Sequence, residues 1–351
     1  MNNKTLIILS PGFAANEEDT TCIPALQQFV IQLKQLRPEL IIKVFALHYP
    51  FKEGKYKWNG IDCFSFGGKN RRGIYAWYSR RKAKKHLSEF CRSENVHGIL
   101  SLWMSDCALI AQQLMKEFKI QHFCWMHGQD ARLGNKHVKN IHPNPEQVIA
   151  ISDLLQKEFE KNYGIRAKHV IENGITENLF PEFNTAERPI DVIGVGSLIP
   201  LKNYSDFIDV VAELKNEFPS INAVVVGEGP EKEMHQKKII EEGLASNVKL
   251  SGSMPHQEVL KYLSQSKILL HTSTYEGSSG VIMEALYSGC FVVTSISVSL
   301  NPVKNIELAT NLNEMTTNIA ALLRNKQLEH ERIIYNTMKN STEKIISLFG
   351  L

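Results

Sequence analysis

The sequence lacks a long apolar segment and lacks closely spaced cysteines. No window approaches the ~18 consecutive apolar residues that a membrane-spanning helix requires. The apolar run at residues 6–10 is too short for the core of a signal peptide and predicts a first β-strand. The six cysteines lie far apart without a CxxC pair, so reduced, mostly buried thiols are expected rather than a zinc module. These absences favour a cytoplasmic globular protein.

The overall charge shows little bias, with 40 Lys and Arg against 37 Asp and Glu. That balance hides a basic segment, because residues 43–92 hold 13 basic and 3 acidic residues. Within it, residues 69–86 contain eight Lys and Arg and no acid. Basic residues interleaved with aromatic ones suit an anionic membrane surface or single-stranded nucleic acid, and the alternative is a solvated helix face with the aromatic rings packed inward. The apolar members are Ile74, Tyr75, Trp77 and Tyr78.

The length of 351 residues favours two domains, each large enough to bury its own core. Short β-branched runs alternate with helical periodicity, which is typical of βα units on a parallel sheet. Residues 181–189 are polar, contain two prolines and interrupt the pattern. We therefore expect two doubly wound α/β domains, residues 1–185 and 190–329. The tail 312–351 is predicted to be helical, with residues 330–351 crossing back onto the first domain.

The second half has the clearest alternation. Helices are predicted near residues 203–217, 231–242, 256–265 and 279–288. Strands are predicted at 189–198, 222–229, 247–252, 267–273 and 290–295.

Ligands bind such sheets outside the carboxyl ends of the strands, so the loops that follow strands carry the candidate site. One loop places Glu276 before a glycine and serine run that opens a helix, with Glu284 eight residues further on. The free N–H groups of that first turn would hold a diphosphate, and Lys202 would add a positive charge. The alternative is a serine N-cap beside solvated charges. The run consists of Gly277, Ser278, Ser279 and Gly280.

Four segments of the second half resemble the nucleotide-sugar half of the retaining family 4 glycosyltransferases. The resemblance implies the GT-B fold, with two Rossmann-like domains facing a cleft. It also implies that a sugar moves from a UDP- or GDP-linked donor with retention of configuration and without a required metal or other cofactor. The chain contains no Asp-x-Asp pair, which agrees with that expectation. The segments are IGVGSLIPLKN (193–203), VGEGPEKEM (226–234), GSMPHQE (252–258) and STYEGSSGVIMEALYSG (273–289).

The resemblance also implies roles for individual donor-side residues. Lys202 would neutralise the donor diphosphate, Glu284 would hold the ribose and Glu276 would face the donor sugar. Ser197 stands where the family usually has arginine, so one ligand of the diphosphate is lost and another basic group must compensate. Backbone at Ser253, Met254 and Pro255 would line the nucleotide base.

The first half supplies the acceptor-side candidates. Gly12 follows the first strand where a βα turn favours glycine, and the resemblance places its loop near the donor phosphates and the acceptor. His127 follows the apolar strand 122–126, so its ring is expected to project into the cleft between the domains. The pattern His127-Gly-x-Asp130 resembles the acceptor-side motif of the family, which implies a hydrogen bond from His127 to sugar and a loop-positioning role for Asp130. Arg132 would assist with phosphate or acceptor charge, or is a solvated loop residue.

The mechanism implied by the resemblance needs no covalent nucleophile. Glu276 and Glu284 lie on one loop and helix, which does not suit the flanking carboxylates of a glycosidase. In the family, the leaving diphosphate accepts the proton of the acceptor on the same face of the sugar. The protein then supplies orientation and charge stabilisation through His127, Glu276 and Lys202.

We therefore expect a retaining glycosyltransferase that acts on a glycan or lipid-linked acceptor in cell-surface polysaccharide or lipopolysaccharide synthesis. Its basic segment 69–86 would meet the inner face of a membrane, because many acceptors of the family are lipid-linked. The alternative is a non-catalytic GT-B protein that binds a nucleotide-sugar or partners a second transferase, which Ser197 supports. Nucleic acid is not an expected partner, because the basic charge is confined to one segment.

Overall fold

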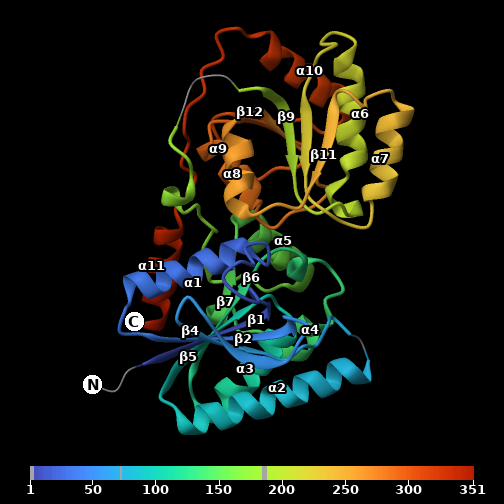
Figure 1. The fold of residues 1–351 in the computed structure, drawn as a ribbon. Helices are drawn as coiled ribbons and strands as arrows, with labels where there is room; N and C mark the ends of the chain where they lie inside the picture. The colour runs from blue at the N-terminus through green and yellow to red at the C-terminus, as the bar shows by residue number, and fades with distance from the viewer. Residues whose placement is uncertain (1–3, 72, 184–187) are drawn as a thin grey trace. The chain divides into compact units, whose positions relative to one another are not determined.

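The computed structural model describes residues 4–71, 73–183 and 188–351, and it divides the chain into two compact units (Figure 1). Unit 1 comprises the chain up to Asn173 together with Met338–Leu351, and unit 2 comprises Gly174–Thr337. Each unit is built on one predominantly parallel β-sheet with helices on both faces. The two doubly wound α/β domains expected from the sequence are confirmed. None of the described helices is both long and apolar enough to cross a membrane.

Unit 1 contains an eight-stranded sheet in the order β3-β4-β2-β1-β5-β6-β7-β8. Residues Leu6–Leu9 of β1 are fully buried, because helices cover both faces of this central strand. The strands are β1 (Thr5–Gly12), β2 (Ile41–Tyr49), β3 (Gly54–Trp58), β4 (Ile61–Ser65), β5 (Val96–Leu102), β6 (Gln121–Met126), β7 (Val148–Ala150) and β8 (His169–Val170). The helices are α1 (Pro24–Leu36), α2 (Ile74–Ser93), α3 (Asp106–Phe118), α4 (Lys136–Ile141), α5 (Asp153–Tyr163) and α11 (Met338–Phe349).

The edge of this sheet is a β-hairpin that was not among the predicted elements. Strands β3 and β4 pair antiparallel, whereas the other pairs of this sheet are parallel. Their two-residue turn has φ values of +45° at Asn59 and +75° at Gly60. An Asn-Gly pair favours such a turn because both central residues need positive φ. The sequence therefore contains the local signal for this hairpin.

Unit 2 contains a six-stranded parallel sheet in the order β11-β10-β9-β12-β13-β14. Its elements reproduce the predicted alternation, with boundaries that shift by a few residues. The strands are β9 (Ile190–Val195), β10 (Ala223–Val226), β11 (Val248–Gly252), β12 (Ser266–His271), β13 (Phe291–Thr294) and β14 (Ile306–Leu308). The helices are α6 (Tyr204–Lys215), α7 (Lys232–Glu241), α8 (His256–Ser264), α9 (Gly280–Tyr287) and α10 (Leu312–Arg324).

The C-terminal tail is not one helical stretch, so the prediction for residues 312–351 was wrong between its ends. Helix α10 ends at Arg324 and α11 begins at Met338. The connecting segment is fixed to the end of α9, because the Ile333 amide donates to the Leu286 carbonyl at 3.1 Å. His330 Nδ1 also lies 2.8 Å from the Gly289 carbonyl oxygen. These contacts hold the segment in an extended form that helical periodicity does not reveal.

Helix α11 returns to unit 1, as expected from the sequence. It packs against α1, and the ring of Phe349 lies over Gly98 in β5 so closely that a Cβ atom there would meet the ring at 2.5 Å. The carbonyl oxygen of Phe349 also lies 2.6 Å from His97 Nε2. The last helix is therefore part of the core of unit 1.

The division between the units lies before the polar segment at which we expected it. Ile175 already belongs to unit 2, where its amide donates to the Asn336 carbonyl at 3.0 Å. The ring of Phe180 packs edge-on against Tyr287 at 4.7 Å, and Arg332 donates to the Pro181 carbonyl. Residues 174–183 thus pack with unit 2, although their sequence has the composition of a linker.

Candidate functional site

The carboxyl ends of β9 and β10 in unit 2 meet backbone to backbone. The amide of Gly196 donates to the Val226 carbonyl at 2.9 Å, and the amide of Leu198 donates to the Glu228 carbonyl at 2.9 Å. A Cβ atom on Gly227 would lie 1.8 Å from the Gly196 carbonyl oxygen, and the φ of Gly227 is +152°. Only glycine fits this crossing. Ser197 directly follows Gly196 at this crossing of the two loops. It is exposed to solvent, so a larger side chain has room there.

Lys202 and Glu276 form an ion pair in unit 2. Lys202 ends the short 3₁₀ helix Pro200–Lys202 after β9, and Glu276 lies in the loop after β12. Their side chains are about four-fifths buried, with exposed fractions of 20% and 18%. His271, the last residue of β12, places Nε2 3.5 Å from Glu276 Oε1. The structure thus brings together two of the three predicted catalytic residues and adds a histidine that the sequence analysis did not select.

The Glu276 carboxylate is ionised over a wide pH range. Burial alone would raise its pKa, but the hydrogen bond with His271 and the positive charge of Lys202 outweigh burial and hold the pKa at about 2. A permanently charged carboxylate is an acceptor of hydrogen bonds and does not act as a general acid near neutral pH.

Helix α9 begins directly after this loop, at Gly280. Ser279 occupies its N-cap position but makes no capping hydrogen bond, because its hydroxyl lies 3.2 Å from His271 Nε2. The serine N-cap considered as an alternative is therefore found by position, but without the side-chain hydrogen bond that would cap the helix. A Cβ atom on Gly280 would meet nothing within 4 Å, so the first turn is open to an incoming group. Uncapped N–H groups at a helix start attract anions.

Glu284 lies within α9 and has a different partner from Glu276. Its Oε1 atom lies 2.7 Å from Nε2 of His256, the first residue of α8. Burial alone would lower the pKa of His256, but the hydrogen bond and the charge of Glu284 outweigh it and raise the pKa above its ordinary value. Glu276 and Glu284 therefore belong to two separate groups of side chains, the first with Lys202 and the second with His256. The predicted residues Ser253, Met254 and Pro255 form the loop that leads into His256, with Ser253 and Pro255 exposed and Met254 partly buried.

Unit 1 carries a pocket of about 510 Å³ at the carboxyl ends of its central strands. Trp103, directly after β5, adopts a positive φ of +61°, which is unusual for a bulky residue and marks a strained position. Asp106 opens α3 beside it, where it lies 3.0 Å from Arg80 and 3.6 Å from His137. The lining of this pocket includes Trp103, Asp106, Asp130 and His137. Of these, only Asp130 was predicted.

His127 and Asp130 occupy the loop after β6. The imidazole of His127 lies between the rings of Trp103 at 4.7 Å and Trp125 at 4.9 Å, so it is packed against aromatic rings instead of projecting freely. Burial lowers its pKa to about 3, which keeps the ring neutral. Its Nε2 atom is buried without a hydrogen-bond partner among the described residues. An orphaned buried nitrogen at a strand end is a candidate ligand-binding atom.

Asp130 has the loop-positioning geometry that the sequence suggested. Its Oδ2 atom accepts hydrogen bonds from the amides of Met104 and His127, both at 3.1 Å. Burial raises its pKa to about 6, despite these hydrogen bonds. Asp130 therefore ties the loop after β5 to the loop after β6.

The acceptor-side candidate Arg132 and the donor-binding candidate Gly12 also lie in unit 1. Arg132 is exposed, and its carbonyl accepts from the Tyr163 hydroxyl at 2.5 Å. Gly12 is the last residue of β1 and has no positive φ, and a Cβ atom there would make only ordinary contacts from 3.5 Å. The turn requirement expected for Gly12 is therefore wrong. Pro11 beside it lines the 510 Å³ pocket.

The residues that the sequence analysis did not select share one position in the fold, at the carboxyl ends of parallel strands. This position could have identified them. Trp103 and Asp106 follow β5, and His271 ends β12, so they belong to the strand-end loops in which ligands bind. Their identities did not match a chemical motif, and no sequence signal pairs His256 with Glu284 across two helices. Within the described residues, no three His, Cys, Asp or Glu side chains form a group that could hold a metal ion.

Parts of this chain are similar to known proteins. Residues 175–339 match the family described as glycosyl transferases group 1. A stretch of 104 residues is 26% identical to 2-deoxystreptamine N-acetyl-D-glucosaminyltransferase of Niallia circulans and covers 30% of this chain and 27% of that protein. The chain thus spans about a quarter of the length of the first curated relatives it matches.

Solved structures are similar over nearly the whole chain. Sucrose-phosphate synthase of Thermosynechococcus elongatus has a TM-score of 0.74 and 16% identity over 99% of this chain and 95% of that one. Anabaena HepE in complex with UDP and glucose has a TM-score of 0.65 and 17% identity over 98% and 97% of the two chains. These likenesses show the fold. The chain has the GT-B fold, and its residues 175–339 form a domain of the glycosyl transferases group 1 family.

Proposed function

We propose that this protein transfers a sugar from a nucleotide-diphosphate sugar to a glycan or lipid-linked acceptor, with retention of configuration and without a metal. The observation that carries the proposal is the Lys202–Glu276 ion pair beside the uncapped start of α9, within the region that matches the family. We take UDP as the nucleotide because HepE, which shares the fold, is a complex with UDP. N-acetylglucosamine is the first donor sugar to test, because it is the group named for the Niallia relative.

The donor would be held by positively charged groups at its diphosphate and by glutamate side chains at its sugar and its ribose. The open first turn of α9 and the ammonium group of Lys202 suit a diphosphate. The ionised carboxylate of Glu276 suits the hydroxyl groups of a sugar. The side-chain oxygens of Glu284 suit the hydroxyl groups of a ribose. His256 occupies one oxygen of Glu284, so the other oxygen is the one that would face the ribose.

The mechanism would depend on orientation and charge stabilisation. As the bond between the sugar and the diphosphate breaks, negative charge grows on the diphosphate, where Lys202 and the start of α9 would stabilise it. The leaving diphosphate would accept the proton of the acceptor hydroxyl on the same face of the sugar. Glu276 would hold the donor sugar in place, and its low pKa keeps it from supplying a proton.

The acceptor would use the 510 Å³ pocket of unit 1. Trp103 offers an aromatic face to a sugar ring, and Asp106 and His137 offer polar atoms to its hydroxyl groups. The orphaned Nε2 of His127 would bond a sugar hydroxyl, and Asp130 would fix the loop that carries His127. These roles favour an acceptor that contains a sugar ring.

The test is release of UDP from UDP-N-acetylglucosamine and other UDP- and GDP-sugars, with and without acceptor extracts. We expect Lys202→Met and Glu276→Gln each to lower the transfer rate by about 10²–10³-fold. The matched control is Lys237→Met with Glu241→Gln, which removes an exposed ion pair of 3.5 Å on α7 and should leave the rate unchanged. Full transfer by Lys202→Met or Glu276→Gln would contradict the assigned roles.

Ser197 separates the enzyme from the non-catalytic alternative. It is exposed on the crossing of the two donor-side loops, so an arginine fits there. We expect Ser197→Arg to tighten UDP binding and to raise transfer, because a guanidinium is a strong ligand of phosphate. If the wild type and Ser197→Arg both bind UDP-sugars but transfer no sugar, the protein is the non-catalytic GT-B protein of the alternative.

We further propose that residues 69–86 dock on an anionic membrane. Of this segment, residue 72 lies outside the described residues. The alternative of inward-packed aromatic rings does not hold in the structure, because Ile74, Tyr75, Trp77 and Tyr78 are exposed by 74%, 61%, 48% and 63%. Each nearby Lys or Arg would add about 1 kcal/mol of attraction to an anionic leaflet.

Flotation with vesicles of phosphatidylcholine and phosphatidylglycerol tests this docking at low and high salt. We expect the protein to float at low salt, and the double variant Trp77→Ser, Tyr78→Ser to stay with the soluble fraction. Leu133→Ser removes an apolar side chain that is 77% exposed elsewhere in unit 1 and should not change flotation. A protein that never floats at low salt would exclude the docking without affecting the donor site.

A further inference from the structure

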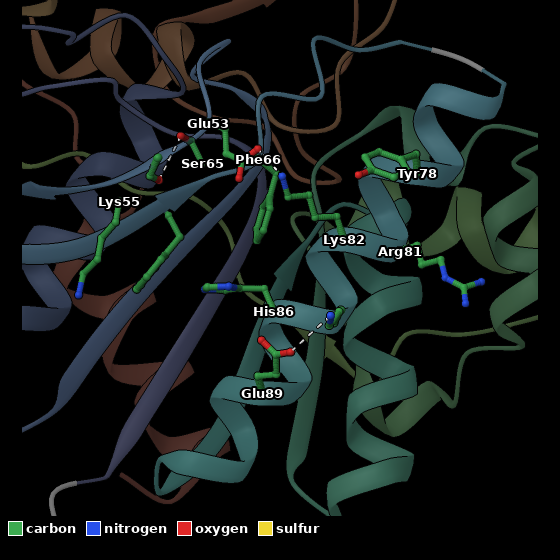
Figure 2. A pocket seen from close by; sticks show the side chains of 12 residues that line it. Glu53, Lys55, Ser65, Phe66, Tyr78, Arg81, Lys82, His86 and Glu89 are labelled. Carbon is green, nitrogen blue, oxygen red and sulfur yellow. Dashed lines mark hydrogen bonds and ion pairs between the residues drawn. The ribbon is translucent and has the colours of Figure 1, made fainter.

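A second pocket of unit 1 shares no lining residue with the 510 Å³ pocket. It has a volume of about 650 Å³ and lies between α2 and the β3–β4 hairpin (Figure 2). Its helical wall is one face of α2, with Tyr78, Lys82, His86 and Glu89 at spacings of three and four residues. A pocket of this size is within the range of about 300–1,000 Å³ that is typical of small-molecule sites.

Aromatic rings form the inner part of this pocket. Phe64 of β4 stacks on the buried Phe45 at 4.6 Å, and His86 lies 5.5 Å from Phe64 and 5.9 Å from Phe66. Phe66, His86 and the stem of Lys82 project into the space between the hairpin and the helix (Figure 2). This part of the pocket therefore suits an apolar group.

Positive charge dominates the rim. Four Lys and Arg residues line the pocket against two glutamates. Lys82 pairs with Glu53 at 2.5 Å, and Lys85 reaches Glu89 at 4.0 Å. Lys55 lies over the ring of Phe64 at 5.4 Å, and no carboxylate of the described residues lies within ion-pair distance of it. Lys55 and Lys82 therefore occupy different parts of a rim that carries more positive than negative charge.

We propose that this pocket binds a single anionic phospholipid, with an acyl chain over Phe64 and Phe66 and the phosphate at the basic rim to which Lys55 and Lys82 belong. An apolar base beneath a positive rim matches a ligand with a chain and an anionic head. The source is a membrane, because Tyr78 belongs both to the pocket and to the exposed apolar turn of α2 that begins at Ile74. The inference goes beyond the proposed transfer reaction and needs neither donor nor acceptor.

The experiment uses the full chain and dihexanoyl phosphatidylglycerol below its micelle concentration, with calorimetric titration as the readout. We expect binding at least tenfold tighter than that of dihexanoyl phosphatidylcholine, which lacks the net charge, and of glycerol phosphate, which lacks the chains. Equal binding of glycerol phosphate would make the pocket a simple phosphate site and would overturn the proposal. Equal binding of the phosphatidylcholine would also overturn it. Because the probe is monomeric, failure of vesicle docking or of transfer does not affect this result.

Phe66 provides a variant that removes part of the apolar base without changing the charge of the pocket. Its ring lines the pocket 5.9 Å from His86. We expect Phe66→Ser to weaken binding of the phosphatidylglycerol at least tenfold, whereas the control Phe51→Ser, which removes a ring that is 56% exposed and does not line the pocket, should bind like the wild type. Unchanged binding by a folded Phe66→Ser would overturn the proposal.

Charge variants keep the proposal testable if Phe66→Ser does not fold. We expect Lys55→Gln with Lys82→Gln to reduce phosphatidylglycerol binding at least tenfold and to leave the weak phosphatidylcholine binding unchanged. Lys116→Gln replaces an exposed lysine at the far end of α3 and is the matched control. If the control and the double variant lose affinity equally, the attraction is general surface charge and the pocket is not the site.

Discussion

His256 Nε2 lies 2.7 Å from Glu284 Oε1, which joins the start of α8 to the interior of α9. Both side chains are more than three-quarters buried, with exposed fractions of 14% and 21%. The raised pKa of His256 means that the folded state holds its proton more tightly than the unfolded state does. The stabilisation is therefore fully present below the ordinary pKa of histidine and is lost as the pH rises through the pKa of the folded state.

We therefore expect His256→Gln to lower the free energy of unfolding by about 2 kcal/mol in acidic solution and by less in alkaline solution. Urea denaturation across this pH range measures the difference. A double-mutant cycle with Glu284→Gln is the control, because the second substitution should cost little once His256 is gone. Equal destabilisation at all pH values would show that Glu284 does not raise the pKa of His256.

The crossing of the two donor-side loops predicts a graded response to alanine. Gly227→Ala should lower the free energy of unfolding by about 3 kcal/mol, because its Cβ atom would overlap the Gly196 carbonyl and its φ is positive. Gly243→Ala should cost about 1 kcal/mol, because Gly243 has a positive φ but open space around it. Gly54→Ala should change stability by less than about 0.5 kcal/mol. Urea denaturation of the three variants measures these differences, and Gly227→Ala and Gly243→Ala would have equal effects if the close approach did not matter.

The elements of unit 2 could be predicted because short apolar runs alternate with segments of helical periodicity. The grouping of Lys202 and Glu276 also followed from the sequence, because both come after parallel strands whose carboxyl ends share an edge. Their partners did not follow. His271 and His256 reach the glutamates only through the pairing of β12 with its neighbours and the packing of α8 on α9.

Tertiary contacts also override local pattern elsewhere. Residues 325–337 have helical periodicity, but their hydrogen bonds to Leu286 and Gly289 hold them extended. The exposed turn at Ile74 could not be inferred from an amphipathic pattern, because apolar residues beside a basic run usually pack inward. The pocket beneath α2 depends on the β3–β4 hairpin. The Asn59-Gly60 turn of this hairpin is a local signal in the sequence, but nothing local predicts how the hairpin lies against α2.

The C-terminal helix should be essential for the stability of unit 1. We expect Phe349→Ala to lower its free energy of unfolding by about 3–5 kcal/mol, because the ring is fully buried and covers Gly98 so closely that little can fill the gap. Phe51→Ala is the control, since that ring is 56% exposed. Hydrogen exchange of β1 and β5 measures the effect within unit 1. Unchanged protection of β5 in Phe349→Ala would contradict the role of α11.

Asp130 should make unit 1 less stable as the pH rises. Its pKa is raised by burial from 3.8 to about 6, so between these values the folded state binds more protons than the unfolded state. Stability therefore falls as the pH rises through this window, by about 3 kcal/mol in total. We expect Asp130→Asn to remove this dependence, because an amide oxygen can still accept from Met104 and His127 and carries no charge.

Urea denaturation between pH 3.8 and about 6 tests this prediction, and above that window Asp130→Asn should match or exceed the wild type in stability. Asp153→Asn, which changes an exposed carboxyl in the first turn of α5, should keep the wild-type pH profile. If Asp130→Asn kept that profile too, burial of the Asp130 charge would not be its cause. If it instead lost several kcal/mol at every pH, the two amide hydrogen bonds would depend on the charge of the carboxylate, and Asp130 would hold its loop as an ion rather than by shape.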